Sequence, residues 1–396
     1  MMKILNWHRF VFRMLKRILK PYLVKKLNYS FEEVKPKHKP YIILANHNTD
    51  YDPFLVGLAF PDQMYYVASE HIFRWGFISK LINFLVAPIP RVKAITEIQT
   101  AINILKRLRA GANVCMFAEG NRSFSGETGE VHPATGKLIK KSGVSLITFR
   151  LDGGYFTSPR WSKTLRKGKM KGRMIKEYSP EEIKSMTVDE VFSAIKKDLY
   201  VDAYEEQEKN PVEYKGYKLA ENLETALYLC PKCDNTATLK SEGDRLFCAC
   251  GLDLKYDTYG YLSSNDDEEP PFKTVLEWCR FQDTWLKQEI EKIKSLPPDE
   301  LIYSDEGQTL WEANRGKNKL IAKGTLLCYN NRIVFVSEDN HKYIYKFNDL
   351  SDLNIIGQMD IAFATNDRQA YEIKSSYPRS ALKYRELFKY LKTHNS

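Results

Sequence analysis

The chain has 396 residues, of which 43% are hydrophobic, and it carries a formal net charge of +10 at pH 7. That length is enough for two or three domains, and the abundance of aromatic residues excludes a disordered chain. The positive charge predicts an anionic partner, namely a phospholipid surface, a phosphorylated substrate or nucleic acid. Seven cysteines, four of them clustered, favour a reducing compartment with a metal site over a disulfide framework.

Residues 1–30 are predicted to form a basic amphipathic helix on an anionic membrane surface. The segment has eight basic residues and no acidic one. Its apolar residues recur at steps of three and four, as expected for one face of a helix: Ile4, Trp7, Val11, Met14, Ile18 and Tyr22. A basic face combined with Trp and Phe is typical of membrane-surface helices. The alternative is that this stripe packs on the protein's own core.

No stretch of eighteen uncharged apolar residues occurs, so no membrane span is predicted. No cleavable signal is expected either, because basic residues interrupt the apolar N-terminal segment. The expected location is therefore the cytoplasmic face of a membrane, with the protein bound peripherally or monotopically.

We expect the chemistry to lie in residues 41–54, which read YIILANHNTDYDPF. The apolar run Tyr41–Ala45 predicts a strand buried on both faces. His47 follows at the carboxyl edge of this strand, where open α/β folds bind ligands, and Asp52 comes after four intervening residues. A histidine accepts a proton near neutral pH, and a nearby carboxylate fixes its tautomer. Because no Ser or Cys nucleophile accompanies the pair, the nucleophile would be a substrate hydroxyl.

Further elements of an α/β domain follow the loop that holds the pair. Residues 64–68 predict a strand, and residues 73–86 predict a buried or monotopic helix. An amphipathic helix with apolar residues from Ile95 to Leu108 ends at Gly111. It leads into the strand of the block Val114–Ser123, VCMFAEGNRS, which gives a strand–helix–strand unit and hence a parallel sheet.

Glu119 and Arg122 are the candidate binding residues of this block. An arginine presents a planar fork that grips phosphate, and a carboxylate can accept a hydrogen bond from a hydroxyl or orient an arginine. The alternative for each is a surface ion pair.

A fourth strand is predicted at residues 144–151, followed by a basic run at 160–173 that includes Trp161. The run is expected either to meet lipid headgroups or the phosphates of a carrier molecule, or to be a solvated loop. Capping boxes at residues 179–182 and 187–190 predict the start of two helices.

A polar connector at residues 203–226 precedes a cysteine-rich segment at 227–263. Four cysteines occur there in two close pairs, separated by fourteen residues: Cys230, Cys233, Cys248 and Cys250. Two pairs of thiolates beside strand-like sequences resemble a zinc ribbon with one structural ion. The alternative is a redox dithiol, which the absence of a thioredoxin-like context disfavours. Four thiolates would fill the coordination of the metal and leave no open catalytic position.

The remainder of the chain reads as an acidic linker at residues 264–272 and a helix plus β-rich domain at 273–396. Short strands between residues 300 and 376 are joined by turns at 330–331, 339–340 and 366–367. A final helix is expected to be capped by Ser380. This order of elements resembles a pleckstrin-homology or GRAM-type domain, which implies lipid or partner binding by analogy.

The motif Asn-His-x4-Asp followed some seventy residues later by Phe-x-Glu-Gly-x-Arg-Ser resembles the glycerolipid acyltransferase family, typified by 1-acylglycerol-3-phosphate acyltransferases. Two further blocks of the family can be found in order. Residues 88–91 keep its arginine as Arg91, with Pro90 where Asp is usual, and residues 144–148 keep its apolar strand without its prolines. The resemblance covers roughly residues 35–200 and implies an acyltransferase domain at 31–202, with a mostly parallel sheet flanked by helices.

The resemblance also implies a reaction. His47 would take the proton from the acceptor hydroxyl as that hydroxyl attacks an acyl thioester of coenzyme A or acyl carrier protein, and Asp52 would orient His47. Arg91 and Arg122 would hold phosphate, and Glu119 and Gly120 would belong to the acceptor site. The implied acceptor is a lysophospholipid, most likely 1-acylglycerol 3-phosphate, with another lysophospholipid or a glycerol phosphate as the alternative. This chemistry needs no cofactor.

A rival reading is a nucleic-acid-binding protein, based on the isoelectric point near 9.0 and the ribbon-like cysteines. It leaves unexplained why two buried strands end in His/Asp and Glu/Arg. A second rival is a catalytically silent lipid-binding scaffold, which the intact His47 and Asp52 disfavour.

Overall fold

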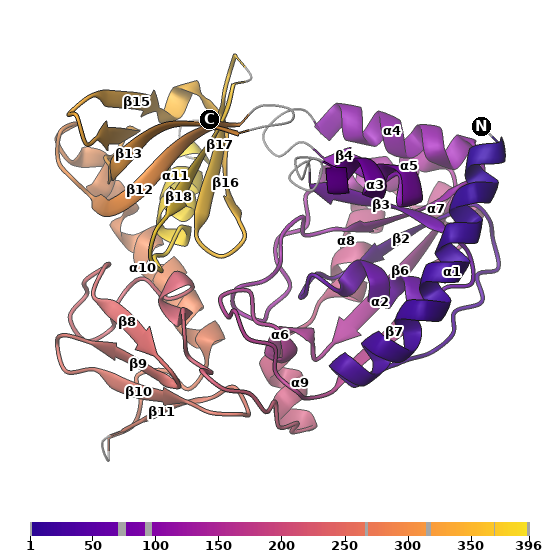
Figure 1. Ribbon diagram of the computed structural model, residues 1–396, viewed down its shortest axis with the longest axis horizontal. Coiled ribbons are helices and arrows are strands. Elements are labelled where there is room, and N and C mark those ends of the chain that lie inside the picture. Colours follow the sequence, from indigo (N-terminus) through magenta and orange to yellow (C-terminus); the bar gives the residue numbers. More distant parts are fainter. Residues whose placement is uncertain are drawn as a thin grey trace. The chain divides into compact units, whose positions relative to one another are not determined.

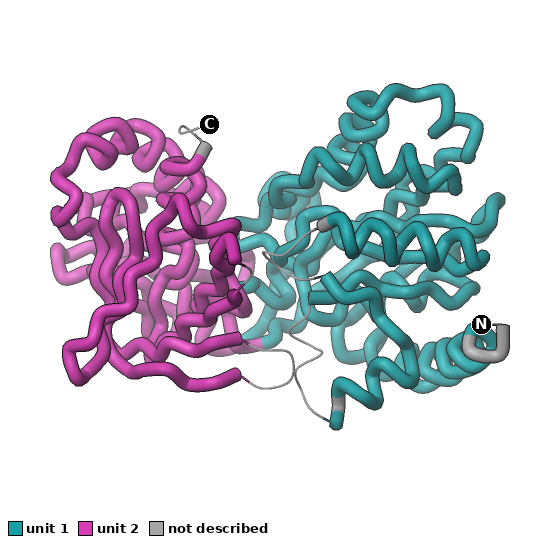
Figure 2. The backbone as a smooth tube through the Cα atoms, turned by 90° about the horizontal axis from the view of Figure 1, so that it is seen from above, with its two compact units in different colours: residues 1–92, 96–160, 165–216 teal, residues 93–95, 161–164, 217–396 magenta. Residues whose placement is uncertain are grey.

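The computed structural model describes residues 2–69, 77–91, 97–265, 268–313, 318–367 and 369–393. The chain divides into two compact units (Figure 2). The first contains most of residues 2–216, and the second contains residues 217–396 together with the short segment 161–164. The main division thus falls inside the polar connector.

The first unit is built on a seven-stranded sheet with the order β1-β7-β6-β2-β5-β3-β4. Its strands are β1 (Tyr29–Phe31), β2 (Tyr41–Ala45), β3 (Met64–Ser69), β4 (Ile89–Arg91), β5 (Asn113–Phe117), β6 (Ser145–Asp152) and β7 (Met170–Tyr178). Among the described strands of this sheet, only β6 and β7 pair antiparallel, and every other neighbouring pair is parallel. The predicted mostly parallel sheet is confirmed.

Helices cover both faces of this sheet (Figure 1). On one face lie α1 (Met2–Leu27) and α2 (Asp52–Ala59), and on the other lie α4 (Glu97–Arg109), α5 (Ala134–Ser142), α7 (Pro180–Ser185) and α8 (Val188–Leu199). The unit also contains α3 (Phe77–Val86), α6 (Gly154–Thr157) and α9 (Ala203–Lys209). The helices predicted at 73–86 and 95–108 are confirmed where the structure describes them, whereas residues 73–76 and 95–96 lie outside the described residues.

Strand β2 shows how the two layers of core are made. All five of its residues are buried. Tyr41, Ile43 and Ala45 pack in a cluster with residues of α1 and α2. Ile42 and Leu44 point to the opposite face and pack with residues of α4, α5, α7 and α8. Side chains alternate across a strand, so an unbroken apolar run is what a sheet covered on both faces requires.

Helix α1 is apolar on two faces, which differs from the single stripe predicted. One face is buried and contains His8, Val11, Leu23 and Leu27. The other face is exposed and contains Trp7, Phe10, Met14, Ile18 and Tyr22. Val11 was assigned to the wrong face, because residues three and four apart can belong to either of two adjacent stripes. The core-packing alternative and an exposed apolar stripe therefore both hold for this helix.

The two predicted capping boxes are confirmed at the starts of α7 and α8. The hydroxyl of Ser179 accepts from the backbone N–H of Glu182, whose carboxylate accepts from the N–H of Ser179. Thr187 and Glu190 repeat this exchange. Each box satisfies backbone donors that the first turn of a helix leaves unpaired.

The basic run at 160–173 is not a solvated loop throughout. The side chains of Arg160, Trp161 and Arg166 are buried. Trp161 packs edge-on against Tyr256 within the second unit, with ring centroids 5.5 Å apart. Trp161 is therefore unavailable for the contact with lipid headgroups considered from the sequence.

The second unit begins with a small antiparallel sheet of order β11-β10-β9-β8. Its strands are β8 (Leu239–Glu242), β9 (Arg245–Cys248), β10 (Asp253–Tyr256) and β11 (Leu262–Ser264), preceded by the short 3₁₀ helix η2 (Leu223–Thr225). The long helix α10 (Val275–Ser295) follows.

The chain ends in a second seven-stranded sheet, which is antiparallel and has the order β15-β14-β13-β12-β18-β17-β16. Its elements are β12 (Tyr303–Ala313), β13 (Asn318–Cys328), β14 (Arg332–Ser337), β15 (Lys342–Lys346), η3 (Phe347–Asp349), β16 (Leu350–Ile356), β17 (Asp360–Thr365), β18 (Ala370–Ser375) and the terminal helix α11 (Leu382–Thr393). The predicted β-rich region with a final helix is confirmed.

All three predicted turns in this region lie between strands. The cap assigned to the final helix is wrong, because α11 begins at Leu382 and the buried hydroxyl of Ser380 has no hydrogen-bond partner. Within the described part of the chain, no helix is both long enough and apolar enough to cross a membrane.

Candidate active site

The loop between β2 and α2 brings together the two residues predicted to be catalytic. Nδ1 of His47 lies 2.9 Å from Oδ2 of Asp52. Asp52 is the first residue of α2 and its side chain is completely buried, whereas that of His47 is 20% exposed. The order strand, loop, helix therefore places the carboxylate behind the imidazole.

Asp52 is held as an acceptor by more than His47. Its Oδ2 accepts from the backbone N–H groups of Asn48 and Thr49, at 2.6 and 2.9 Å. Its Oδ1 accepts from the hydroxyl of Thr49 at 2.6 Å. Both oxygens of Asp52 therefore act as acceptors, so Nδ1 of His47 is the donor in its bond to Asp52.

That hydrogen bond leaves Nε2 as the ring nitrogen of His47 that can accept a proton. No described residue is hydrogen-bonded to Nε2. The imidazole stacks on the ring of Phe117 at the end of β5, with centroids 4.4 Å apart and an interplanar angle of 23°. Stacking on one side and the carboxylate behind fix the direction in which Nε2 points.

Glu119 supports the backbone of His47. Its Oε1 accepts from the N–H of His47 at 2.7 Å, and its Oε2 accepts from the N–H of Gly129 at 2.6 Å. Burial raises the pKa of Glu119 to about 8, although both amide hydrogen bonds act to lower it. The carboxylate therefore joins the His47 loop to the loop that contains Gly129.

Arg91 and Gly120 lie side by side, although 28 residues separate them in the sequence. A Cβ atom on Gly120 would come 2.0 Å from Nη1 of Arg91, so only a glycine lets the guanidinium lie this close to the backbone. Gly120 also has a φ of +68°, in the region that favours glycine. The position of Arg91 at the end of β4 is thus matched to the turn after β5.

Arg122 is tied to two loops around the site. Its Nε donates to the carbonyl of Asn48 at 2.7 Å, and its Nη2 donates to the carbonyl of Ser158 at 2.6 Å. Nη1 forms an ion pair with the exposed carboxylate of Asp50 at 3.0 Å. Arg122 is therefore already oriented by protein groups, and its side chain is 15% exposed.

Several supporting residues were not identified from the sequence. The side-chain amide of Asn46 exchanges two hydrogen bonds with the backbone of Leu151 on β6, at 2.8 and 2.9 Å. Thr49 and Phe117 complete the surroundings of the catalytic pair. The pattern Thr-x-x-Asp at the start of a helix was the one available signal, because it is typical of a carboxylate that bonds nearby backbone amides.

The four clustered cysteines lie together in the second unit. Their sulfur atoms are all within 4.8 Å of one another. The structure thus brings together the four residues that the sequence proposed as metal ligands.

Comparison with protein families gives a match to the Acyltransferase family over residues 26–152. This range includes all six residues predicted for catalysis and acceptor binding. Comparison with curated proteins gives no significant match.

Several solved structures are similar to parts of the chain. A 1-acyl-sn-glycerophosphate acyltransferase, PlsC, from Thermotoga maritima shares 18% identity at a TM-score of 0.41, over 50% of this chain and 80% of that one. A chain of the 8S snRNP assembly intermediate shares 13% identity at a TM-score of 0.21, over 25% of this chain and 87% of that one. The linker-DH/PH domains of p115-RhoGEF share 10% identity at a TM-score of 0.19, over 30% of this chain and 46% of that one.

The family match and the motif residues that it encloses agree. Residues 26–152 form a domain of the acyltransferase family, and the chain is an acyltransferase enzyme.

Proposed function

We propose that this acyltransferase esterifies a lysophospholipid, and that its acceptor is 1-acylglycerol 3-phosphate. The acyl group would come from a thioester of coenzyme A or acyl carrier protein. The observation that supports this proposal is the His47–Asp52 pair, with Nδ1 bonded to a buried carboxylate and Nε2 hydrogen-bonded to no described residue.

In the proposed reaction, Nε2 of His47 takes the proton from the acceptor hydroxyl. The oxygen then attacks the thioester carbonyl, the carbon–sulfur bond breaks, and the thiolate leaves with the proton returned by His47. Asp52 stabilises the imidazolium that forms between these two steps. General-base catalysis of this kind contributes roughly 10²–10⁴-fold to the rate.

Two arginines are proposed to bind the phosphate of the acceptor. Arg91 is only partly exposed and lies against Gly120, the residue that follows Glu119 in the sequence. Arg122 has its Nε bonded to the carbonyl of Asn48, the residue after His47. An arginine oriented by protein groups loses less side-chain entropy on binding phosphate than a free one.

The proposed membrane contact is the exposed apolar surface formed by α1 and α3. On α1 it comprises Trp7, Phe10, Met14, Ile18 and Tyr22, and on α3 it comprises Phe77, Leu81 and Phe84. The two helices meet where Nε1 of Trp7 donates to the carbonyl of Phe84 at 3.1 Å. The rings of Trp7 and Phe84 also lie 5.3 Å apart, so the exposed apolar residues of the two helices adjoin at this point, and exposed apolar patches mark interaction sites.

The charges beside this surface favour an anionic phospholipid bilayer as its occupant. Exposed basic residues flank the α1 stripe, among them Arg9, Arg13, Arg17 and Lys20. No acidic residue occurs before Glu32. Each Lys or Arg near an anionic surface contributes about 1 kcal/mol, which falls off within a Debye length.

The test is an acyl-transfer assay with purified protein, a panel of lysolipids and both donor types, read by product mass. We expect phosphatidic acid from 1-acylglycerol 3-phosphate, and no product from a folded His47→Ala variant. Product formation from a different lysolipid alone would overturn the acceptor assignment. Near-normal turnover by the folded His47 variant would overturn the mechanism.

A further inference from the structure

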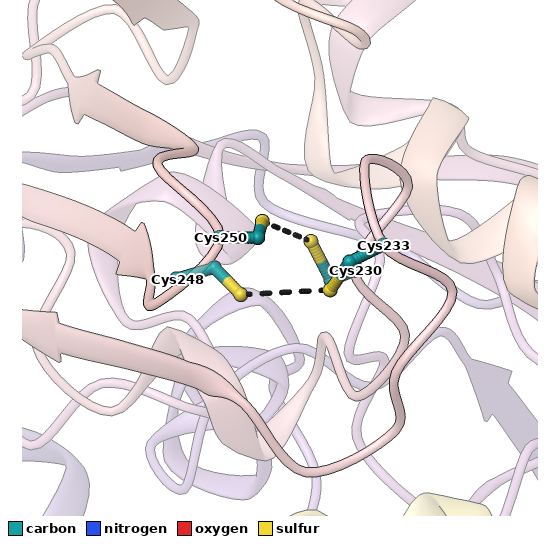
Figure 3. A group of neighbouring side chains, drawn as sticks. All are labelled: Cys230, Cys233, Cys248 and Cys250. Carbon is teal, nitrogen blue, oxygen red and sulfur yellow. Dashed lines mark hydrogen bonds between the residues drawn. The ribbon is translucent and has the colours of Figure 1, made fainter.

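The four cysteines of the second unit come from two separate turns that face each other (Figure 3). Cys230 and Cys233 precede β8, whereas Cys248 ends β9 and Cys250 lies in the turn before β10. Across the gap, the sulfur of Cys230 lies 3.6 Å from that of Cys250, and the sulfur of Cys233 lies 3.8 Å from that of Cys248.

These separations match a tetrahedral metal site. Four thiolates at about 2.3 Å from a zinc ion are separated from one another by about 3.8 Å. A disulfide would instead bring two sulfurs to about 2.05 Å, and all four cysteines are free thiols. The donor set is also chemically suitable, because four soft sulfur ligands in tetrahedral positions favour zinc.

Backbone groups around the sulfurs complete the site. The N–H of Asp234 donates to the carbonyl of Cys230 at 2.9 Å, and the N–H of Gly251 donates to the carbonyl of Cys248 at 3.0 Å, which closes each turn tightly. Gly251 has a φ of +91°, so a glycine is favoured at this position. The hydroxyl of Thr238 lies 3.1 Å from the sulfur of Cys248 and 3.9 Å from that of Cys233, where it can donate to a thiolate. Such a donor neutralises part of the charge of a tetrathiolate site.

We infer that Cys230, Cys233, Cys248 and Cys250 hold one zinc ion, and that this ion fastens the β8–β11 sheet to helix α10. Four protein ligands leave no position for a substrate, so the site is structural. The inference concerns the second unit alone and does not depend on the proposed acceptor or donor.

The connection to α10 starts at the residues immediately before Cys230. Oε1 of Gln282 accepts from the N–H groups of Tyr228 and Leu229, at 2.6 and 3.0 Å. Nε2 of Gln282 donates to the carbonyl of Ala226 at 3.2 Å, and Nε1 of Trp278 donates to the carbonyl of Leu229 at 2.8 Å.

The side chains of Trp278 and Gln282 are buried, so water cannot replace these bonds without opening the packing. Cys230 is bonded directly to Leu229 along the chain, and a metal that fixes Cys230 also restricts the segment that α10 grips. Loss of the metal should therefore reach α10 as well as the ribbon itself.

The first test is the metal content of protein purified without oxygen or chelator. We expect roughly one zinc per chain in the native protein and in Cys279→Ser, a control that removes a thiol of α10 outside the cluster. Cys230→Ser should lose most of the metal. Zinc-free native protein with all its thiols reactive would overturn the inference, as would iron in place of zinc.

A second measurement covers the case in which Cys230→Ser does not fold. Native protein stripped of metal is titrated with Co²⁺, whose sulfur-to-metal charge-transfer absorbance reports the number of thiolate ligands. We expect an end point at about one ion per chain with the intensity of four thiolates. Cys250→Ser, at a partly exposed position, should reduce that intensity by about a quarter. Unchanged intensity in this variant would overturn the assignment of Cys250 as a ligand.

The connection to α10 is tested separately by Gln282→Leu and by hydrogen exchange. Gln282→Leu leaves all four ligands in place, so it should retain the zinc but release it to a chelator several-fold faster than Cys279→Ser does. Metal removal from the native protein should accelerate amide exchange at residues 226–230 and in the first half of α10. Equal release rates, with faster exchange confined to residues 230–251, would show that the metal does not fasten α10.

Discussion

Glu119→Gln separates two roles for this residue, binding of the acceptor and support of the His47 backbone. The wild-type carboxyl group presents one oxygen to the N–H of His47 and the other to the N–H of Gly129. A carboxamide has nearly the same shape but only one acceptor oxygen. Its NH₂ group must therefore face one of the two backbone donors.

The variant loses stability because its NH₂ group, a hydrogen-bond donor, faces a backbone N–H, which is also a donor. A buried N–H that loses its acceptor costs about 1–3 kcal/mol. If the variant keeps its oxygen on Gly129, the His47 loop loses its anchor and the imidazole shifts. A misplacement of about 1 Å at a catalytic group can cost about 10²-fold, so we expect kcat to fall roughly 10- to 100-fold. The KM for the acceptor should change little.

The ionisation of Glu119 supplies a second readout. Its pKa is raised from 4.5 to about 8 by burial, so between these values the folded chain holds a proton that the unfolded chain has lost. The contribution of Glu119 to stability is therefore present at low pH and declines as pH rises, by up to about 1.4 kcal/mol per pH unit. The carboxamide of the Glu119→Gln variant cannot ionise, so the stability of the variant should not show this decline with pH.

The assay combines turnover at saturating acceptor with denaturant unfolding from pH 5 to pH 8. Glu130→Gln serves as the control, because Glu130 is an exposed carboxylate close by in the sequence. We expect Glu119→Gln to be less stable than wild type at pH 5 and to lose that disadvantage as pH rises. An increase in acceptor KM with kcat and stability both unchanged would refute the supporting role and favour direct contact with the acceptor.

Three further changes test the rest of the site. Asp52→Asn should lower kcat about 10²–10⁴-fold and the free energy of unfolding by about 2–4 kcal/mol, because Oδ2 of Asp52 accepts from three donors. A variant with the kcat and the denaturant stability of the wild type would contradict this. Arg122→Ala should raise the KM for a phosphorylated acceptor more than the KM for the thioester, and a change confined to the thioester would place the phosphate elsewhere. Phe10→Ser and Ile18→Ser should each weaken sedimentation with anionic vesicles about fivefold, for a loss of about 1 kcal/mol of apolar burial. Ile344→Ser, at an equally exposed isoleucine of β15, should bind like wild type, and equal losses in all three would refute a specific surface on α1.

Much of the first unit could be predicted from the sequence because its strands are short apolar runs. Tyr41–Ala45 was predicted with the bounds that the structure has, since a strand buried on both faces has no polar position inside it. The His47–Asp52 pair was also predictable, because strand, loop and helix follow one another within twelve residues. Both features could be predicted because they depend only on residues that are close together in the sequence.

The remaining features depend on contacts between segments that are distant in sequence. Nothing in residues 117–123 indicates that both oxygens of Glu119 meet backbone amides, since one of those amides belongs to His47. The basic run at 160–173 gave no sign that the guanidinium of Arg160 lies 4.2 Å from the ring centre of Phe124 and donates to the carbonyl of Arg122. A long arginine stem packs well in a core when its charged end finds acceptors.

Helix α1 holds α2 at both ends. The ammonium group of Lys26 donates to the hydroxyl of Tyr51, immediately before Asp52, and that of Lys16 donates to the carbonyl of Phe60, just after α2 ends. Helix α1, which exposes aromatic residues on its outer face, thus also supports the helix that begins with Asp52. A shortened protein without residues 2–27 would expose the apolar side of α2 as well as lose the surface stripe. The proposed membrane contact must therefore be tested by point changes on the outer face of α1, since deletion of the whole helix would also disturb α2.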